Sequence, residues 1–90
     1  MKSTSDGLNR RDHNTRRNIA FTRSFFTGIQ KYAIVWTADA ESTFKYLNAT
    51  TPMLLSYSMV GMSFNGGDIP GFMYHPKEDL CRRWYQLGIF

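Results

Sequence analysis

Two aspartates, each on a turn rich in Gly or Ala after a short apolar run, constrain the fold of this chain more than any other feature. Asp39 follows the run 32–36, and Asp68 follows the run 61–64 through a pair of glycines. Such runs are typical of buried parallel strands. Side chains at the carboxyl ends of neighbouring parallel strands meet at one edge, where β/α barrels and doubly wound sheets carry their chemistry. The spacing therefore predicts a site built around two carboxylates.

The length of the chain limits what can support such a site. Ninety residues form at most one small domain, and a chain of that size buries only about 60 to 65% of its unfolded surface. Aromatic side chains make up 16% of the residues, including Trp36 and Trp84, which is more ring surface than so small a core usually encloses. We therefore expect the chain to be a piece of a larger protein.

The pattern of apolar and polar residues predicts strands that alternate with helices. Residues 1–18 are polar and predict a loop or the remnant of a helix, and residues 19–90 carry the pattern of a partial barrel domain. We expect strands at 19–22, 32–36 and 61–64. One helix is expected from residue 41, and a second is expected to be capped by Thr51 with Pro52 at its first position. A last helix is expected from Pro76, with Leu80, Trp84 and Leu87 on one face. This order favours parallel pairing, although three strands do not close a barrel.

Arg23 stands at the end of the first expected strand, so three strand ends carry Arg23, Asp39 and Asp68 as one ring of charge. On composition alone, an Asp in a glycine-rich turn is more often a turn residue, because its side chain bonds the local backbone. Trp36 and Phe72 are most simply interpreted as core residues. Flat rings beside carboxylates are also what a sugar-binding pocket uses, so the residues alone leave both interpretations open.

Charge and ligand patterns disfavour other functions. Seven of the eleven Lys and Arg lie in the first thirty-one residues, as in some nucleic-acid-binding arms. No aromatic stacking motif lies among them, so we expect no nucleic-acid partner. His13 and His75 have no ligand partner at metal spacing, so no metal site is predicted. No run approaches the roughly eighteen apolar residues of a membrane span, so no membrane span is expected.

Several stretches, taken together and in order, are similar to glycoside hydrolase family 31. They are Asp6 to Leu8 and the segments 23–28, 30–32, 36–39, 51–56, 60–72 and 83–88. The resemblance covers nearly the whole chain. It implies an α/β fold, namely a fragment of a (β/α)8 TIM barrel that runs from about the fifth strand to the helix after the seventh.

The resemblance assigns a role to each candidate residue. Asp39 matches the general acid/base, and Arg23 and Asp68 match residues that hydrogen-bond the sugar where the bond breaks. Trp36 and Phe72 match rings that line that pocket. The family implies an α-glucosidase that hydrolyses terminal α-linked glucose from oligosaccharides or N-glycans with retention, and it implies no cofactor. Its nucleophile is an aspartate on an earlier strand that this chain lacks, so the isolated chain is expected to be inactive.

The resemblance is strongest toward family members of the endoplasmic reticulum, which implies that compartment and, as a partner, a regulatory β subunit. Two positions depart from the family pattern, because Ala38 and Ala40 flank Asp39 where the family usually has Gly and often Asn. If the first position needs a positive φ, Ala38 costs about 1 kcal/mol and tilts Asp39. A second hypothesis is therefore a remnant that binds carbohydrate without hydrolysing it. A third, based on the arginine pairs, is a basic nucleic-acid-binding module.

Overall fold

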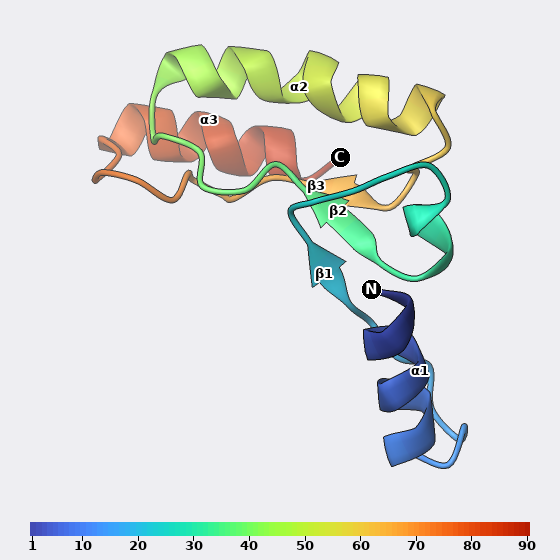
Figure 1. The fold of residues 1–90 in the computed structure, drawn as a ribbon. Coiled ribbons are helices and arrows are strands. Elements are labelled where there is room, and N and C mark those ends of the chain that lie inside the picture. The colour runs from blue at the N-terminus through green and yellow to red at the C-terminus, as the bar shows by residue number, and fades with distance from the viewer.

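A small parallel sheet with helices on one side of it forms the centre of the computed structural model, which describes residues 1–90 (Figure 1). The elements are α1 (Lys2–Arg11), β1 (Phe21–Thr22), the short 3-10 helix η1 (Ile29–Lys31), β2 (Ile34–Trp36), α2 (Phe44–Met59), β3 (Asn65–Gly66) and α3 (Glu78–Gly88). From β1 onward, the predicted alternation of strands with helices is confirmed, although one helix, α2, replaces the two helices expected between the second and third strands. None of the helices combines the length and the apolar character that crossing a membrane requires.

The three strands pair in chain order, and both pairs are parallel. Phe21 of β1 lies opposite Ile34 of β2, and Trp36 at the end of β2 lies opposite Gly66 of β3. Because the strands run in the same direction, their carboxyl ends lie at the same edge of the sheet. The loops that carry Asp39 and Asp68 therefore both start from that edge.

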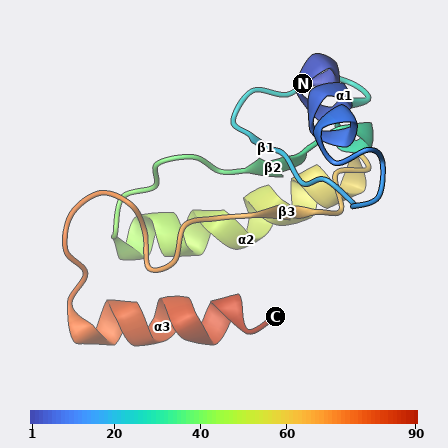
Figure 2. The same ribbon diagram turned by 90° about the horizontal axis from the view of Figure 1, so that it is seen from below.

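The two faces of the sheet differ in burial. Val35 is 1% exposed and packs with the buried Ile29 and Met62, with Tyr57 of α2 against this cluster. Phe21, whose side chain lies on the opposite face because residues alternate along a strand, is 63% exposed. Helices α2 and α3 lie together on one side of the strands in both views (Figures 1 and 2). One covered and one bare face is the arrangement expected of barrel strands whose inner face is completed by further strands.

Helix α2 corrects the prediction that a new helix starts at Thr51 and Pro52. The helix is continuous from Phe44, with Thr43 as its N-cap accepting a hydrogen bond from the Tyr46 N–H at 3.3 Å, and Pro52 lies inside it. Pro52 is exposed, so its ring and the helical carbonyl that loses a partner can both face water. That solvent position is why a residue that usually ends helices is tolerated here.

The third strand is also displaced from the predicted segment 61–64. Gly61 adopts a φ of +86° just after α2, and Met62 is buried in the core, so β3 forms only at Asn65–Gly66. The last helix agrees better with the prediction. Its N-cap is Lys77, one residue after the predicted start, and the expected inner face holds Leu80 and Trp84 buried and Leu87 half-buried.

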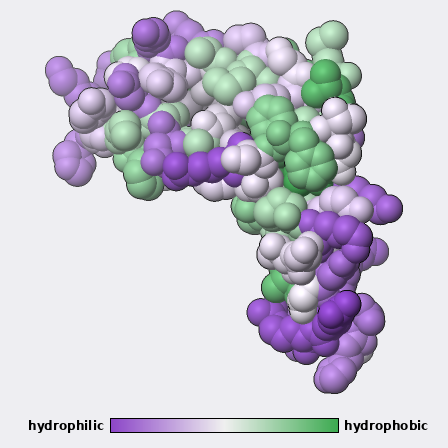
Figure 3. Space-filling view, in the orientation of Figure 1, coloured by the Kyte–Doolittle hydropathy of each residue, from purple (hydrophilic) through white to green (hydrophobic).

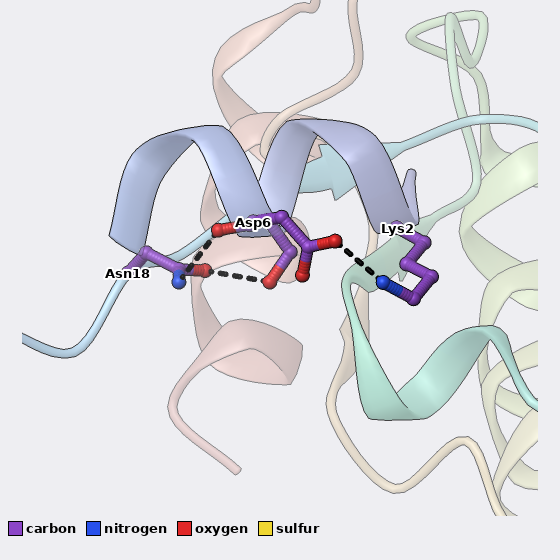
Figure 4. A network of polar contacts seen from close by, with 4 residues as sticks. Lys2, Asp6 and Asn18 are labelled. Carbon is purple, nitrogen blue, oxygen red and sulfur yellow. Dashed lines mark hydrogen bonds and ion pairs between the residues drawn. The ribbon is translucent and has the colours of Figure 1, made fainter. Parts of the chain in front are cut away.

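Helix α1 lies apart from α2 and α3 (Figure 1). Of the two structures predicted for the polar N-terminal segment, a loop or the remnant of a helix, the helix is the one observed. Lys2 and Asp6 form an ion pair at 2.5 Å along the helix, and Asn18 donates a hydrogen bond to the carbonyl of Ser5 at 3.3 Å (Figure 4). Hydrophilic side chains gather over α1 and the turn after it, whereas apolar ones gather over the middle of the molecule (Figure 3).

The molecule is elongated for its length. It measures 46 × 25 × 20 Å, and its radius of gyration is 15.2 Å, compared with about 12 Å for a compact domain of this size. Only 10 of the 90 residues are buried. Much of the apolar surface of these elements is therefore left without packing partners within the chain.

Candidate active site

An arginine from the end of β1 and an aspartate from the end of β2 meet at the carboxyl edge of the sheet. The guanidinium Nη2 of Arg23 lies 2.6 Å from Oδ1 of Asp39, as a hydrogen bond and an ion pair. The same guanidinium lies over the ring of Trp36, 5.5 Å from its centroid, at cation–π distance. The structure thus brings together three of the five candidate residues that the sequence singles out.

Asp68 reaches the same edge from β3. Its Oδ2 atom is buried and makes no hydrogen bond within the chain. Burial, and secondly the negative charge of Asp39, raise the pKa of the Asp68 carboxyl above its ordinary value of 3.8, while the charge of Arg23 lowers it. The three side chains therefore form one electrostatic unit, in which Asp68 keeps an unused hydrogen-bond acceptor.

The backbone at Ala38 is unusual for its residue type. Ala38 adopts a φ of +60° immediately before Asp39, in the left-handed region that glycine occupies without strain. One residue earlier, the Thr37 N–H donates to the carbonyl of Gly66 at 2.9 Å and continues the β2–β3 ladder. The chain must then turn sharply to place Asp39 over the sheet edge, and Ala38 takes the left-handed conformation there.

Phe72 is placed differently from the other candidates. Its side chain is 64% exposed, while its backbone N–H donates to the carbonyl of Ala40 at 2.7 Å in the loop after Asp39. Trp36 is half-buried and lines a hollow of about 470 Å³ on the bare face of the sheet, together with Phe21, Ile34 and residues 65–68. Hollows of this volume accommodate small organic ligands.

The structure shows no cluster of three or more His, Cys, Asp or Glu side chains that could hold a metal ion. The polar groups at the sheet edge are two carboxylates and one guanidinium. Carboxylates can donate and accept protons, and a guanidinium forms directed hydrogen bonds to oxygen. This set is suited to hydroxyl-rich substrates and to acid/base chemistry.

All residues of the chain, 1–90, match the model of the family described as "Glycosyl hydrolases family 31 TIM-barrel domain". The chain belongs to glycoside hydrolase family 31. Its parallel sheet and helices are part of that TIM-barrel domain, and the resemblance noted from the sequence is confirmed. The listed curated relatives of this family 31 chain are described as alpha-glucosidases.

Among curated relatives, neutral alpha-glucosidase C of Macaca fascicularis is 46% identical over 88 residues, which are 98% of this chain and 11% of the relative. A probable glucan 1,3-alpha-glucosidase of Oryza sativa subsp. japonica is 41% identical over the same share of this chain and 10% of its own length. The family 31 chain spans about a tenth of the length of the curated relatives it matches.

Among solved structures, the glucosidase II alpha subunit described as bound to alpha3-Glc2 matches with a TM-score of 0.80 and 44% identity, over 82% of this chain and 8% of that one. The catalytic subunit in a complex described as ER glucosidase II with the binding domain of its regulatory subunit matches with the same values. At this identity and TM-score, the fold of the family 31 chain is that of the matching part of these barrels.

Sequence reasoning missed two residues that lie in contact close to the site. Ser42 and Gly71 lie against each other in the loops after β2 and β3, and neither was a candidate. Main-chain pairing between loops leaves no trace in residue type, so Ser42 carries no sequence pattern that predicts it. At Gly71 the sequence does indicate a turn, because this glycine follows a proline shortly after Asp68.

Proposed function

We propose that this chain is the part of a retaining α-glucosidase that supplies the general acid/base and several sugar contacts. The observation that supports the proposal is the meeting of Arg23, Asp39 and Asp68 at the carboxyl edge of three parallel strands, in a chain of a glycosidase family. Chemistry in β/α barrels is located at that edge. The proposed segment runs from about the fifth barrel strand to the helix after the seventh. In this proposal residues 1–18 are a polar N-terminal segment, and residues 19–90 are the partial barrel domain.

In this proposal Asp39 first protonates the leaving oxygen and later removes a proton from water. Retaining hydrolysis needs a second carboxylate as nucleophile about 5 Å away, and the proposed nucleophile comes from an earlier strand of the complete barrel. Arg23 turns from Asp39 toward a sugar hydroxyl when substrate binds. Because the double displacement needs both carboxylates, the isolated chain is inactive.

Asp68 and the two rings bind the sugar. The unpartnered Oδ2 of Asp68 accepts a hydrogen bond from a sugar hydroxyl, which removes the cost of leaving it unsatisfied. Trp36 and Phe72 present flat apolar surfaces to the C–H face of the ring. Binding of glucose therefore gives each group at the sheet edge a partner.

The substrate proposed is a terminal α-linked glucose of an oligosaccharide or N-glycan. A relative described as a glucan 1,3-alpha-glucosidase and a matching structure described as bound to alpha3-Glc2 favour an α-1,3 linkage. The matching complex described as ER glucosidase II also supports the endoplasmic reticulum as compartment and a regulatory β subunit as partner.

The test uses a chimera in which this chain replaces the 88 matched residues of neutral alpha-glucosidase C of Macaca fascicularis. We call this protein the chimera. Asp39→Asn is expected to lower kcat/KM by roughly 10² to 10⁴ for glucosides with poor leaving groups and far less for activated aryl glucosides, which need little protonation. Asp12→Asn, an aspartate that pairs with Arg11 after α1, is the matched control. An equal loss on both substrate types would show that Asp39 is not the acid.

A second candidate function is carbohydrate binding without hydrolysis. The observation that favours it is the left-handed backbone of Ala38, which strains the turn that aims Asp39. This alternative predicts that the chimera binds an α-glucoside, measured by calorimetry, but shows no turnover, and that Ala38→Gly restores turnover. Turnover by the unmodified chimera would exclude it.

A further inference from the structure

The loops that follow β2 and β3 are joined by main-chain hydrogen bonds beyond the two aspartates. The N–H groups of Phe72 and Met73 both donate to the carbonyl of Ala40, at 2.7 and 3.0 Å. In return, the N–H of Ser42 donates to the carbonyl of Met73 at 2.9 Å. This is the pattern of a parallel bridge, so the pairing of β2 with β3 resumes after the site residues.

Both aspartates are therefore anchored on two sides. Before them lies the ladder of β2 and β3, which ends with the bond from Thr37 to Gly66. After them lies the loop clamp, by which we mean residues 40–42 and 71–73 together. Only a few residues separate the two anchors in each loop, so the backbone limits how far apart the two aspartates can move.

The loop clamp requires glycine at position 71. Gly71 adopts a φ of +112°, and a Cβ placed on it would lie 2.5 Å from Oγ, 2.8 Å from Cα and 2.9 Å from N of Ser42. Two of these three atoms are backbone, and Ser42 is 7% exposed. A side chain at position 71 therefore cannot be accommodated by a rotamer change and must push the two loops apart.

We propose that Gly71 is a positioning residue, which acts through the loop clamp to set the separation of Asp39 and Asp68 during catalysis. The inference rests on the proposed function, because it assigns the loop clamp a role in that reaction. It adds a residue that touches neither substrate nor reacting atoms.

The chemical consequence is electrostatic. Arg23 faces the site from β1, Asp39 from the loop after β2 and Asp68 from the loop after β3, and these three groups act on one another. Burial, and secondly the negative charge of Asp39, raise the pKa of the Asp68 carboxyl. Moving the loops apart weakens that repulsion, and it also displaces Asp39 from the leaving oxygen that it is proposed to protonate.

The test compares two glycine variants of the chimera. Gly71→Ala is expected to lower kcat about 10²-fold, as small displacements of reacting groups do, with KM unchanged. The loss should be larger for glucosides with poor leaving groups than for activated aryl glucosides, because the displaced group is the proposed acid. Gly28→Ala is the matched control, because Gly28 also has a positive φ, +93°, but no atom within 4 Å of its Cβ position. It should leave kcat and its dependence on the leaving group unchanged.

A second variant covers the case in which Gly71→Ala does not fold. In Met73→Pro the ring replaces the N–H that donates to Ala40, on a side chain that is 44% exposed. The same loss of kcat, larger for poor leaving groups, is expected. An unchanged kcat, or an equal loss on both substrate types, in either folded variant of an active chimera whose Asp39→Asn form behaves as an acid variant would overturn the role of the loop clamp alone. Failure of the proposed function would instead appear as an equal loss on both substrate types in Asp39→Asn itself.

Discussion

Arg23 and Asp39 are sixteen positions apart in the chain, yet Nη2 of the first lies 2.6 Å from Oδ1 of the second. Their side chains are 55% and 28% exposed, and ion pairs at such positions contribute only about 0 to 1 kcal/mol to folding. The pair therefore has little effect on stability. Its effect is to hold a guanidinium and a carboxylate face to face at the edge where substrate would bind.

The first prediction concerns Arg23→Gln in the chimera. We expect kcat/KM to fall mainly through a higher KM, because Arg23 is proposed to bind the sugar in ground and transition states alike. Added azide should not restore the rate. The free energy of unfolding should change by less than about 1 kcal/mol. Steady-state kinetics with and without azide check this, and a loss confined to kcat would contradict the proposed binding role.

The second prediction concerns the left-handed residue beside the acid. Ala38→Gly is expected to stabilise the chimera by about 0.5 to 1 kcal/mol, because relief of the positive φ outweighs the added freedom of the unfolded chain. Ala40→Gly is the contrasting variant, since Ala40 is 3% exposed and is not among the residues with positive φ. It should destabilise by about 1 kcal/mol. Urea midpoints of the two variants measure both effects, and equal destabilisation would argue against strain at Ala38.

The third prediction follows from the raised pKa of Asp68. The folded state binds the proton of the Asp68 carboxyl more tightly than the unfolded state does. The stability that this proton contributes is therefore fully present below about pH 3.8, and it is lost as the pH rises through the folded-state pKa. At neutral pH the charged Asp68 opposes folding. Asp68→Asn should therefore be more stable than the unmodified chimera near pH 7, with an advantage that shrinks toward about pH 4, and it should bind substrate more weakly.

Thermal unfolding across this pH range provides the measurement for Asp68→Asn. Asp12→Asn is the control, because Asp12 lies beside Arg11 after α1 and remote from the carboxylate pair. If Asp68→Asn were less stable than the unmodified protein at neutral pH, the carboxylate would be a net stabilising group, and the assigned direction of its pKa shift would be wrong.

The fourth prediction is that the isolated chain does not form a stable, cooperative monomer. Strands β1 and β3 are unpaired on their outer edges, and large apolar side chains such as Phe21, Phe64 and Phe72 are more than half exposed. Such edges and patches favour association. Circular dichroism and the fluorescence of Trp36 and Trp84 should give broad or non-coincident urea transitions. A single coincident transition in a monodisperse monomer would show that the ninety residues are self-sufficient.

The sequence predicted the elements that depend on local pattern. The apolar run before Asp39 and the amphipathic face of Leu80 and Trp84 appear in the structure as β2 and α3. Predictions failed where tertiary context decides. Pro52 would end an isolated helix, but in α2 it lies on the solvent side, and β3 begins only after the backbone leaves Gly61 in a left-handed conformation.

For the site, residue types indicated which side chains meet but not how they are held. Arg23 and Asp39 were recognisable because they follow successive strands, as Asp68 does, and the carboxyl ends of parallel strands meet at one edge. The left-handed backbone was anticipated at Ala38 only through the family pattern. The loop clamp could not be predicted from the sequence, since hydrogen bonds between main-chain groups do not depend on which side chains are attached.

That independence from side chains has an evolutionary consequence. The loop clamp is made of main-chain bonds, with one position, Gly71, that admits a single residue type. Phe72, Met73 and Tyr74 beside it are all exposed. Substitutions at Met73 other than proline can therefore alter the outward surface of the loop while the main-chain bonds of the loop clamp are kept. A loop built this way can vary on its outward surface while the main-chain geometry beneath it is kept.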